Sequence, residues 1–223
     1  MEPRLTGINL NEALIYLGCK GGKLSGQGLE ELKCCEEQLL KAARPRAVWR
    51  RFSLLPDGTL SGTGFCPLGE DVKALLADCR EVILMAATLG AEIEALIRRA
   101  QVQNMGRAMM LDACASAAIE NVCDNLCEDL GRQVSPLYLT DRFSPGYGDF
   151  PLSTQADFSS LLDMQRRIGV SLSPGGLMIP QKTVTALIGL SDRPQATRPR
   201  GCAVCDLFEN CAFRKDGLHC GKN

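Results

Sequence analysis

One apolar run constrains the fold of this chain more than any other stretch. It is Glu81-Val-Ile-Leu-Met-Ala-Ala-Thr88, and Leu89-Gly90 follows it directly. The run is continuous, and it is short enough to be a strand that is buried on both of its faces. We therefore expect a buried strand over residues 81–88 that ends at Leu89-Gly90.

Periodicity and turn residues predict the elements around this strand. We expect helices at about 9–17, 27–43, 69–79, 91–103, 107–132 and 157–168, a hairpin at 48–60, and strands at 134–140, 177–180 and 183–190. The order contains no repeated βα units, so it predicts an α+β fold with a mainly antiparallel sheet covered by helices. A polar linker that begins at Asp192 separates a domain of residues 1–192 from a tail of residues 193–223.

Charge and hydropathy exclude several classes of partner. A formal net charge of -1 over 223 residues gives no sign of a nucleic-acid or acidic-membrane partner. No apolar run approaches the roughly 18 residues that a membrane span requires, and the N-terminal residues lack the apolar core of a signal peptide. The composition therefore predicts a soluble, cytoplasmic protein.

The stretch from Asp141 to Leu152 is rich in residues that restrict or free the backbone. Pro145 fixes its own φ and disfavours the helical region for Ser144, whereas Gly146 and Gly148 permit positive φ or a close approach to a bulky group. We predict an ordered, bent loop.

This loop also carries groups that could bind a small molecule. Arg142 offers a planar fork to a carboxylate or phosphate, and Tyr147 offers a stacking face with a polar tip. Asp141 and Asp149 add two carboxylates. The pattern predicts one wall of a ligand pocket, and the alternative is a turn between two strands in which Arg142 is merely solvated.

Twelve cysteines without a signal peptide are expected to be thiols and metal ligands rather than disulfides. Eight are scattered through helix-like and strand-like segments, where free cysteine usually behaves as a small buried hydrophobe: Cys19, Cys34, Cys35, Cys66, Cys79, Cys114, Cys123 and Cys127. Cys123 and Cys127 stand one helical turn apart and could pair in a site.

The other four cysteines form a metal-binding pattern in the tail, Cys202-x2-Cys205-x5-Cys211-x8-Cys220. Four thiolates that begin with a C-x-x-C pair match the ligand count of a structural zinc site or an iron-sulfur cluster. The uneven spacing favours a [4Fe-4S] cluster, and zinc is the alternative. His219 adjoins Cys220 and could substitute as a ligand.

Three motifs together resemble the activation domain of cobalamin-dependent methionine synthase, in the stand-alone form found in anaerobic bacteria. Arg142-Phe-Ser-Pro-Gly-Tyr147 fits that family's R-x-x-x-G-Y signature. Leu177-Met-Ile-Pro-Gln-Lys-Thr-Val-Thr185 is similar to its Met-x-Pro and Ser-Val-Ser segments, and Asn11-Glu-Ala-Leu-Ile-Tyr-Leu-Gly18 resembles the opening helix of the stand-alone members. The resemblance covers most of residues 9–192.

The resemblance implies binding of S-adenosylmethionine (SAM) and reductive methylation of an inactive Co(II) cobalamin. One electron reduces the cobalt to Co(I), and the sulfonium methyl is then transferred to it. Arg142 would hold the carboxylate of the methionine moiety, and the backbone of Ser144, Pro145, Gly146 and Tyr147 would lie along the nucleoside or the corrin. Glu120 and Asp149 are candidates for the ligand's ammonium, and salt bridges between helix and loop are their alternative role.

The partners implied are proteins that bring the corrinoid and the electron. His219 is the only histidine, so no cobalt-ligating Asp-x-His-x-x-Gly motif exists here. Cobalamin would arrive on a corrinoid protein or on a methionine synthase that lacks its own activation domain. A ferredoxin or flavodoxin would donate the electron, and a cluster in the tail could relay it.

One departure from the family leaves other functions open. Where the family's strand brings an aromatic residue toward the ligand, this chain has Leu187-Ile188. The chain would then be part of a cobalamin-dependent methyltransferase reactivation system, or an iron-sulfur electron-transfer module that docks on a corrinoid methyltransferase without binding SAM. A zinc-stabilised interaction domain is the third hypothesis.

Overall fold

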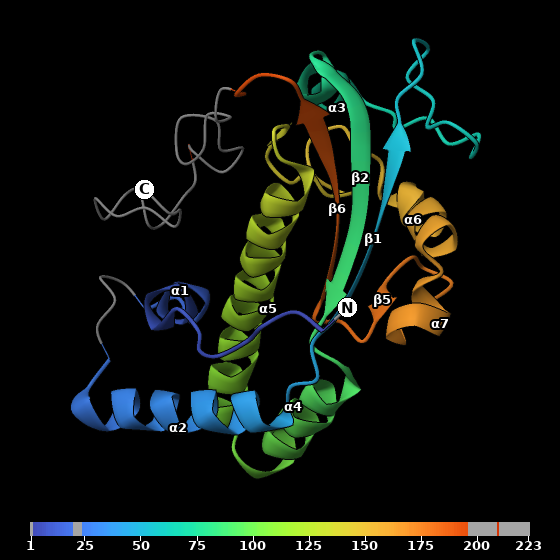
Figure 1. Cartoon of the computed structure of the whole chain (residues 1–223). Coiled ribbons are helices and arrows are strands. Elements are labelled where there is room, and N and C mark those ends of the chain that lie inside the picture. Colours follow the sequence, from blue (N-terminus) through green and yellow to red (C-terminus); the bar gives the residue numbers. More distant parts are fainter. Residues whose placement is uncertain (1, 20–23, 196–208, 210–223) are drawn as a thin grey trace.

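The computed structural model describes residues 2–19, 24–195 and 209. A four-stranded antiparallel sheet with the order β1-β2-β6-β3 forms its centre, and a separate two-stranded ribbon joins β4 to β5 (Figure 1). The strands are β1 (Arg46–Ser53), β2 (Cys79–Thr88), β3 (Tyr138–Leu139), β4 (Ser171–Leu172), β5 (Met178–Ile179) and β6 (Thr183–Ser191). The predicted α+β class with an antiparallel sheet is confirmed.

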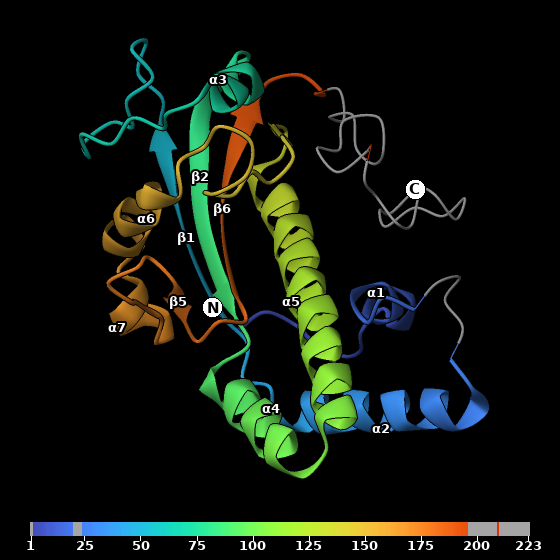
Figure 2. The ribbon, with the colours of Figure 1, turned by 180° about the vertical axis from the view of Figure 1, so that it is seen from behind.

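Helices cover the sheet on both faces. They are α1 (Leu10–Tyr16), α2 (Gly26–Ala42), α3 (Glu70–Leu76), α4 (Ala91–Gln103), α5 (Met105–Val134), α6 (Gln155–Leu162) and α7 (Met164–Ile168), with a 3-10 turn at Leu152–Thr154. The long helix α5 runs beside the sheet, α1, α2 and α4 pack against α5, and α6 and α7 lie on the other face (Figures 1 and 2).

Strand β2 is buried on both faces, as its sequence predicts. Ile83, Met85 and Ala87 belong to the core between the sheet and α5, whereas Val82 and Leu84 belong to the core beneath α6 and α7. Because successive side chains of a strand point to opposite faces, one continuous apolar run serves both cores.

Local signals explain where the first helices begin. The side chain of Asn9 accepts hydrogen bonds from the backbone of Asn11 and Glu12, and that of Ser25 accepts one from Gly28. Gly18 has a φ of 70° just after α1, which glycine adopts without steric cost. Residues 9–17 and 27–43 were predicted as helices, and both predictions are confirmed to within about one residue.

Three predicted elements differ from the structure. The hairpin expected at 48–60 is reduced to an isolated bridge between Leu54 and Leu60, because β1 pairs instead with the distant strand β2. The helix expected at 157–168 breaks at Asp163, whose φ of 51° is left-handed. The strand expected at 134–140 spans only Tyr138–Leu139, because α5 continues as far as Val134.

Two sequence predictions concern parts that the structure does not cover. The tail with Cys202, Cys205, Cys211 and Cys220 lies outside the described residues, so the metal site and the division at residue 192 stay predictions. Within the described part of the chain, no helix is long and apolar enough to cross a membrane.

Candidate ligand-binding site around Arg142

The loop after β3 is tied to the sheet and folded back on itself. Backbone hydrogen bonds of 2.9 and 2.8 Å join Phe143 to Leu187 of β6, and the Gly146 amide donates to the Phe150 carbonyl at 2.8 Å. Gly146 and Gly148 have φ values of 92° and 52°. The bent loop predicted from its prolines and glycines is therefore present, and its first residues are fixed against β6.

Arg142 is paired rather than merely solvated. Its Nη2 atom lies 3.0 Å from Oε2 of Glu120 and 3.0 Å from Oδ1 of Asp124, and its Nη1 donates to the Cys127 thiol at 3.7 Å. The Arg142 side chain is 21% exposed, against 33% for Glu120 and 44% for Asp124. Helix α5 thus presents two carboxylates and a thiol to one loop guanidinium.

The spacing of these residues on α5 explains why they share one cation. Glu120 and Asp124 are four residues apart and Cys127 three further, so all three lie on one side of the helix. Sequence reasoning found Glu120 but missed Asp124. The spacing of four residues could have identified Asp124, because an acidic residue one helical turn after Glu120 faces the same direction.

Burial disfavours the charged form of Arg142, but the hydrogen bond to Cys127 and the charge of Asp124 favour it, and the net effect is a raised pKa. Burial raises the pKa of the Cys123 thiol to about 12, and the opposing influence of Arg142 is smaller. The cation is therefore permanent and the Cys123 thiol stays protonated at neutral pH.

Two tyrosines lie close to this cluster. Burial raises the pKa of Tyr16, at the end of α1, to about 12, and the charges of Glu120, Glu12 and Tyr147 add to the shift. Tyr16 is 50% exposed and Tyr147 is 68% exposed, so both rings keep accessible surface. Tyr147 was predicted as a site residue from the sequence. Tyr16 was given no role, although Tyr16 lies within the motif of residues 11–18.

The remaining predicted site residues differ in their burial and in their hydrogen-bond partners. Pro145 is buried, Gly146 is exposed, and the Ser144 carbonyl accepts a hydrogen bond from the Tyr147 amide at 3.2 Å. Asp149 lies at the start of α3, where its carboxylate accepts hydrogen bonds from the amides of Glu70 at 2.6 Å and Asp71 at 3.2 Å. The Asp149 carboxylate thus holds the far end of the loop against α3.

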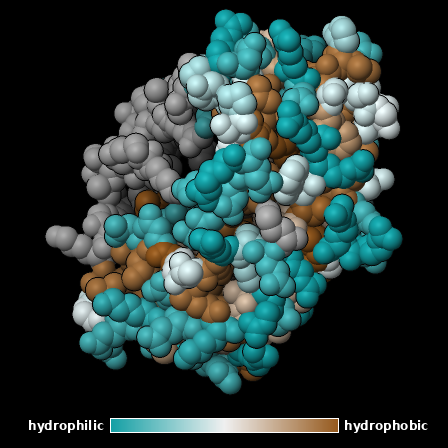
Figure 3. Space-filling view, in the orientation of Figure 1, coloured by the Kyte–Doolittle hydropathy of each residue, from teal (hydrophilic) through white to brown (hydrophobic). Residues whose placement is uncertain are grey.

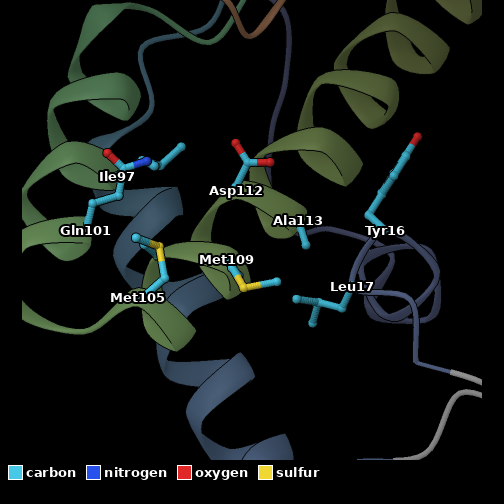
Figure 4. A pocket seen from close by; sticks show the side chains of 9 residues that line it. Tyr16, Leu17, Ile97, Gln101, Met105, Met109, Asp112 and Ala113 are labelled. Carbon is cyan, nitrogen blue, oxygen red and sulfur yellow. The ribbon is translucent and has the colours of Figure 1, made fainter.

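A shallow hollow of about 220 Å³ adjoins Tyr16 (Figure 4). Helices α1, α4 and α5 line it with Tyr16, Leu17, Ile97, Gln101, Met105, Ala108, Met109, Asp112 and Ala113. Apolar residues also gather on the surface between α1 and α2 (Figure 3). Asp112 is held at 2.8 Å by Lys182, whose Nζ also donates to Ser116 at 2.9 Å. The hollow and the Arg142 cluster therefore lie along the same helix, with Tyr16 at the border of the hollow.

The described residues contain no cluster of three or more His, Cys, Asp or Glu side chains that could hold a metal ion. Leu187 and Ile188 are both fully buried in β6, where they contribute to the two cores. In the methionine synthase activation domains that the sequence resembles, an aromatic residue stands at this place in the strand. Here the two residues pack into the cores instead.

Comparisons with known proteins support the fold. No protein-family model matches the sequence, and no curated protein matches it. Among solved structures, the chain is similar to the crystal structure of the MetH reactivation domain bound to AdoHcy, with a TM-score of 0.58 and 17% sequence identity. The match covers 76% of this chain and 66% of the other, just under two thirds of its length. This likeness shows that the chain has the fold of that reactivation domain.

Proposed function

We propose that this chain binds SAM at Arg142 and supports the reductive reactivation of a cobalamin carried by a partner protein. The observation that carries the proposal is the Arg142, Glu120 and Asp124 cluster, placed at the surface of a fold shared with the AdoHcy-bound reactivation domain of MetH. AdoHcy, S-adenosylhomocysteine, is what SAM becomes when it gives up its methyl group.

The charges of the cluster suit the amino-acid end of such a ligand. A guanidinium has five N–H donors in a fixed fork, and a ligand carboxylate can take a bidentate position on it. Glu120 is then available to accept a hydrogen bond from the ligand's ammonium. Both charges of a zwitterion are matched within one small, partly water-shielded region.

The loop supplies the rest of the proposed site. Gly146 is exposed, so its main chain is accessible to a ligand, and Tyr147, which is 68% exposed, offers a stacking face. The role of these residues is to bind and orient the methyl donor and to exclude water from it, which contributes to methyl transfer by positioning. The reaction needs no Ser-His-Asp or Cys-His arrangement.

Cobalamin is a substrate that the partner protein delivers. The sequence has one histidine, His219, and lacks a cobalt-ligating motif. A corrinoid protein, or a methionine synthase without its own activation domain, is the proposed partner, with a ferredoxin or flavodoxin as electron donor. If the four tail cysteines hold an iron-sulfur cluster, that cluster adds redox capacity to the chain that binds the methyl donor.

A calorimetric titration of anaerobically purified protein with SAM tests this proposal. We expect specific binding that Arg142→Ala weakens by roughly ten- to a hundredfold, because one charge-assisted carboxylate contact contributes about 1.5–3 kcal/mol. Arg132→Ala is the matched control, because Arg132 is also paired with an acidic residue of α5 but on its exposed side. Equal binding by the wild type and both variants would contradict the assignment of Arg142.

The second candidate is an electron-transfer module that docks on a corrinoid enzyme without binding SAM. The burial of Leu187 and Ile188 favours it, since no aromatic ring can reach a ligand from that part of β6. Complete absence of SAM binding in a preparation that contains iron would support this candidate instead.

A further inference from the structure

Tyr16 lies beside the proposed methyl-donor site without belonging to its loop. It ends α1, which packs against α5, and it lies at the border of the hollow that Asp112 and Ala113 of α5 also line. In Figure 4 its side chain extends away from the hollow, alongside the following turns of α5. Glu120 is also on α5. It follows Ala113 by seven residues and Asp112 by eight, so it lies two turns further along the same side of the helix.

The surroundings of Tyr16 are acidic and aromatic. Burial raises the pKa of its hydroxyl, and the charges of Glu120 on α5, Glu12 on α1 and Tyr147 in the loop raise it further. With its pKa near 12, the Tyr16 phenol is neutral at every pH at which the protein would work. The ring is half exposed, which leaves surface for contact with a ligand.

An aromatic ring next to carboxylates is a favourable environment for a cation that has no hydrogen to donate. The face of the ring carries the negative part of its quadrupole and attracts cations such as quaternary ammonium groups. A sulfonium belongs to the same chemical class, because its charge is spread over carbon substituents and it donates no hydrogen bond. Carboxylates close to the ring also attract such a cation, because their charge is opposite to its own.

We propose, on the basis of the function proposed above, that Tyr16 is a specificity-determining residue that recognises the sulfonium of SAM and so favours the methyl donor over its demethylated product. SAM and AdoHcy share their carboxylate, ammonium and nucleoside. They differ in the sulfur, which is a cation in SAM and a neutral thioether in AdoHcy. Arg142 and Glu120 cannot distinguish the two ligands by their shared groups, whereas a ring face directed at the sulfur can.

The test compares the dissociation constants for SAM and AdoHcy in the wild type and in three variants. Tyr16→Leu removes the ring, and Tyr16→Phe keeps it without the hydroxyl. Tyr138→Leu is the control, because Tyr138 is an exposed tyrosine on β3 and belongs neither to α1 nor to the Arg142 loop.

We expect Tyr16→Leu to weaken SAM binding by about two- to fivefold, the range of a partly exposed cation–π contact, and to leave AdoHcy affinity nearly unchanged. Tyr16→Phe and Tyr138→Leu should keep the wild-type ratio of the two constants. An equal loss for both ligands in Tyr16→Leu, or no loss for either, would overturn the sulfonium role while leaving the proposed function intact. Failure of the wild type to bind both ligands would overturn the proposed function and this inference together.

Discussion

Replacing Arg142 with alanine is expected to destabilise the folded chain even without a ligand. Its Nη2 atom is the shared partner of Glu120 and Asp124, each at 3.0 Å, and the side chain is only 21% exposed. Without the guanidinium, two carboxylates one helical turn apart lose this cation and repel each other.

The size of the effect follows from the exposure of the partners. An exposed ion pair contributes about 0.2–1 kcal/mol, and a hydrogen bond to a charged group about 1.5–3 kcal/mol. Glu120 and Asp124 are 33% and 44% exposed, so water screens both pairs and the lower range applies. Two such pairs contribute about 0.4–2 kcal/mol, and the repulsion between the two carboxylates adds about 0.2–0.5 kcal/mol. We therefore expect a loss of about 0.6–2.5 kcal/mol, which corresponds to a fall in Tm of roughly 1–10 °C for a chain of this size.

Thermal unfolding followed by circular dichroism measures this loss. Arg132→Ala, which removes an exposed ion pair of the same helix, should lower the Tm by clearly less. The triple variant Arg142→Ala, Glu120→Gln, Asp124→Asn should recover part of the loss, because the repulsion is removed. Equal Tm values for Arg142→Ala and Arg132→Ala would refute the idea of a preformed charge cluster.

Two further predictions concern the cysteines. Burial raises the pKa of the Cys114 and Cys123 thiols from 9.0 to about 12, so the unfolded chain releases these protons first as the pH rises. The contribution of these thiols to the free energy of unfolding is constant below pH 8, and the free energy of unfolding, measured with urea, should fall between about pH 9 and 12. No fall in this window would show that these thiols are not buried. Anaerobically purified protein should contain iron or zinc, and changing both Cys202 and Cys205 to serine should remove it in elemental analysis, whereas a full metal content in that variant would exclude the tail as the site.

Much of the fold could be predicted because local signals agree with the tertiary structure. Residues 82–87 of β2 are all apolar since both faces are covered, and Asn9 and Gly18 mark the limits of α1 through a cap and a left-handed turn. The hairpin expected at 48–60 forms only around its Pro56-Asp57-Gly58 turn, where Leu54 and Leu60 bridge, because this turn says nothing about which strand lies beside β1. The pairing of β1 with β2 joins residues that are 28 to 42 positions apart in the chain.

The candidate site was predictable in its loop and at Glu120, an acidic residue in an apolar neighbourhood of α5. Arg142, Gly146 and Tyr147 stand out because their residue types are unusual in such a short stretch. Asp124 and Tyr16 belong to ordinary amphipathic helices, and only the packing of α1 and α5 against the loop shows that they lie near Arg142. Asp149 has the same residue type as a ligand-binding carboxylate, but the tertiary structure uses it to cap α3.

The most direct measurement of the central claim is a crystal structure of the protein with AdoHcy bound. We predict that the ligand's carboxylate lies within hydrogen-bonding distance of the Arg142 guanidinium, with its ammonium facing Glu120 and its nucleoside against the backbone of residues 144–148. A ligand bound elsewhere, with the Arg142 ion pairs to Glu120 and Asp124 unchanged, would contradict the account.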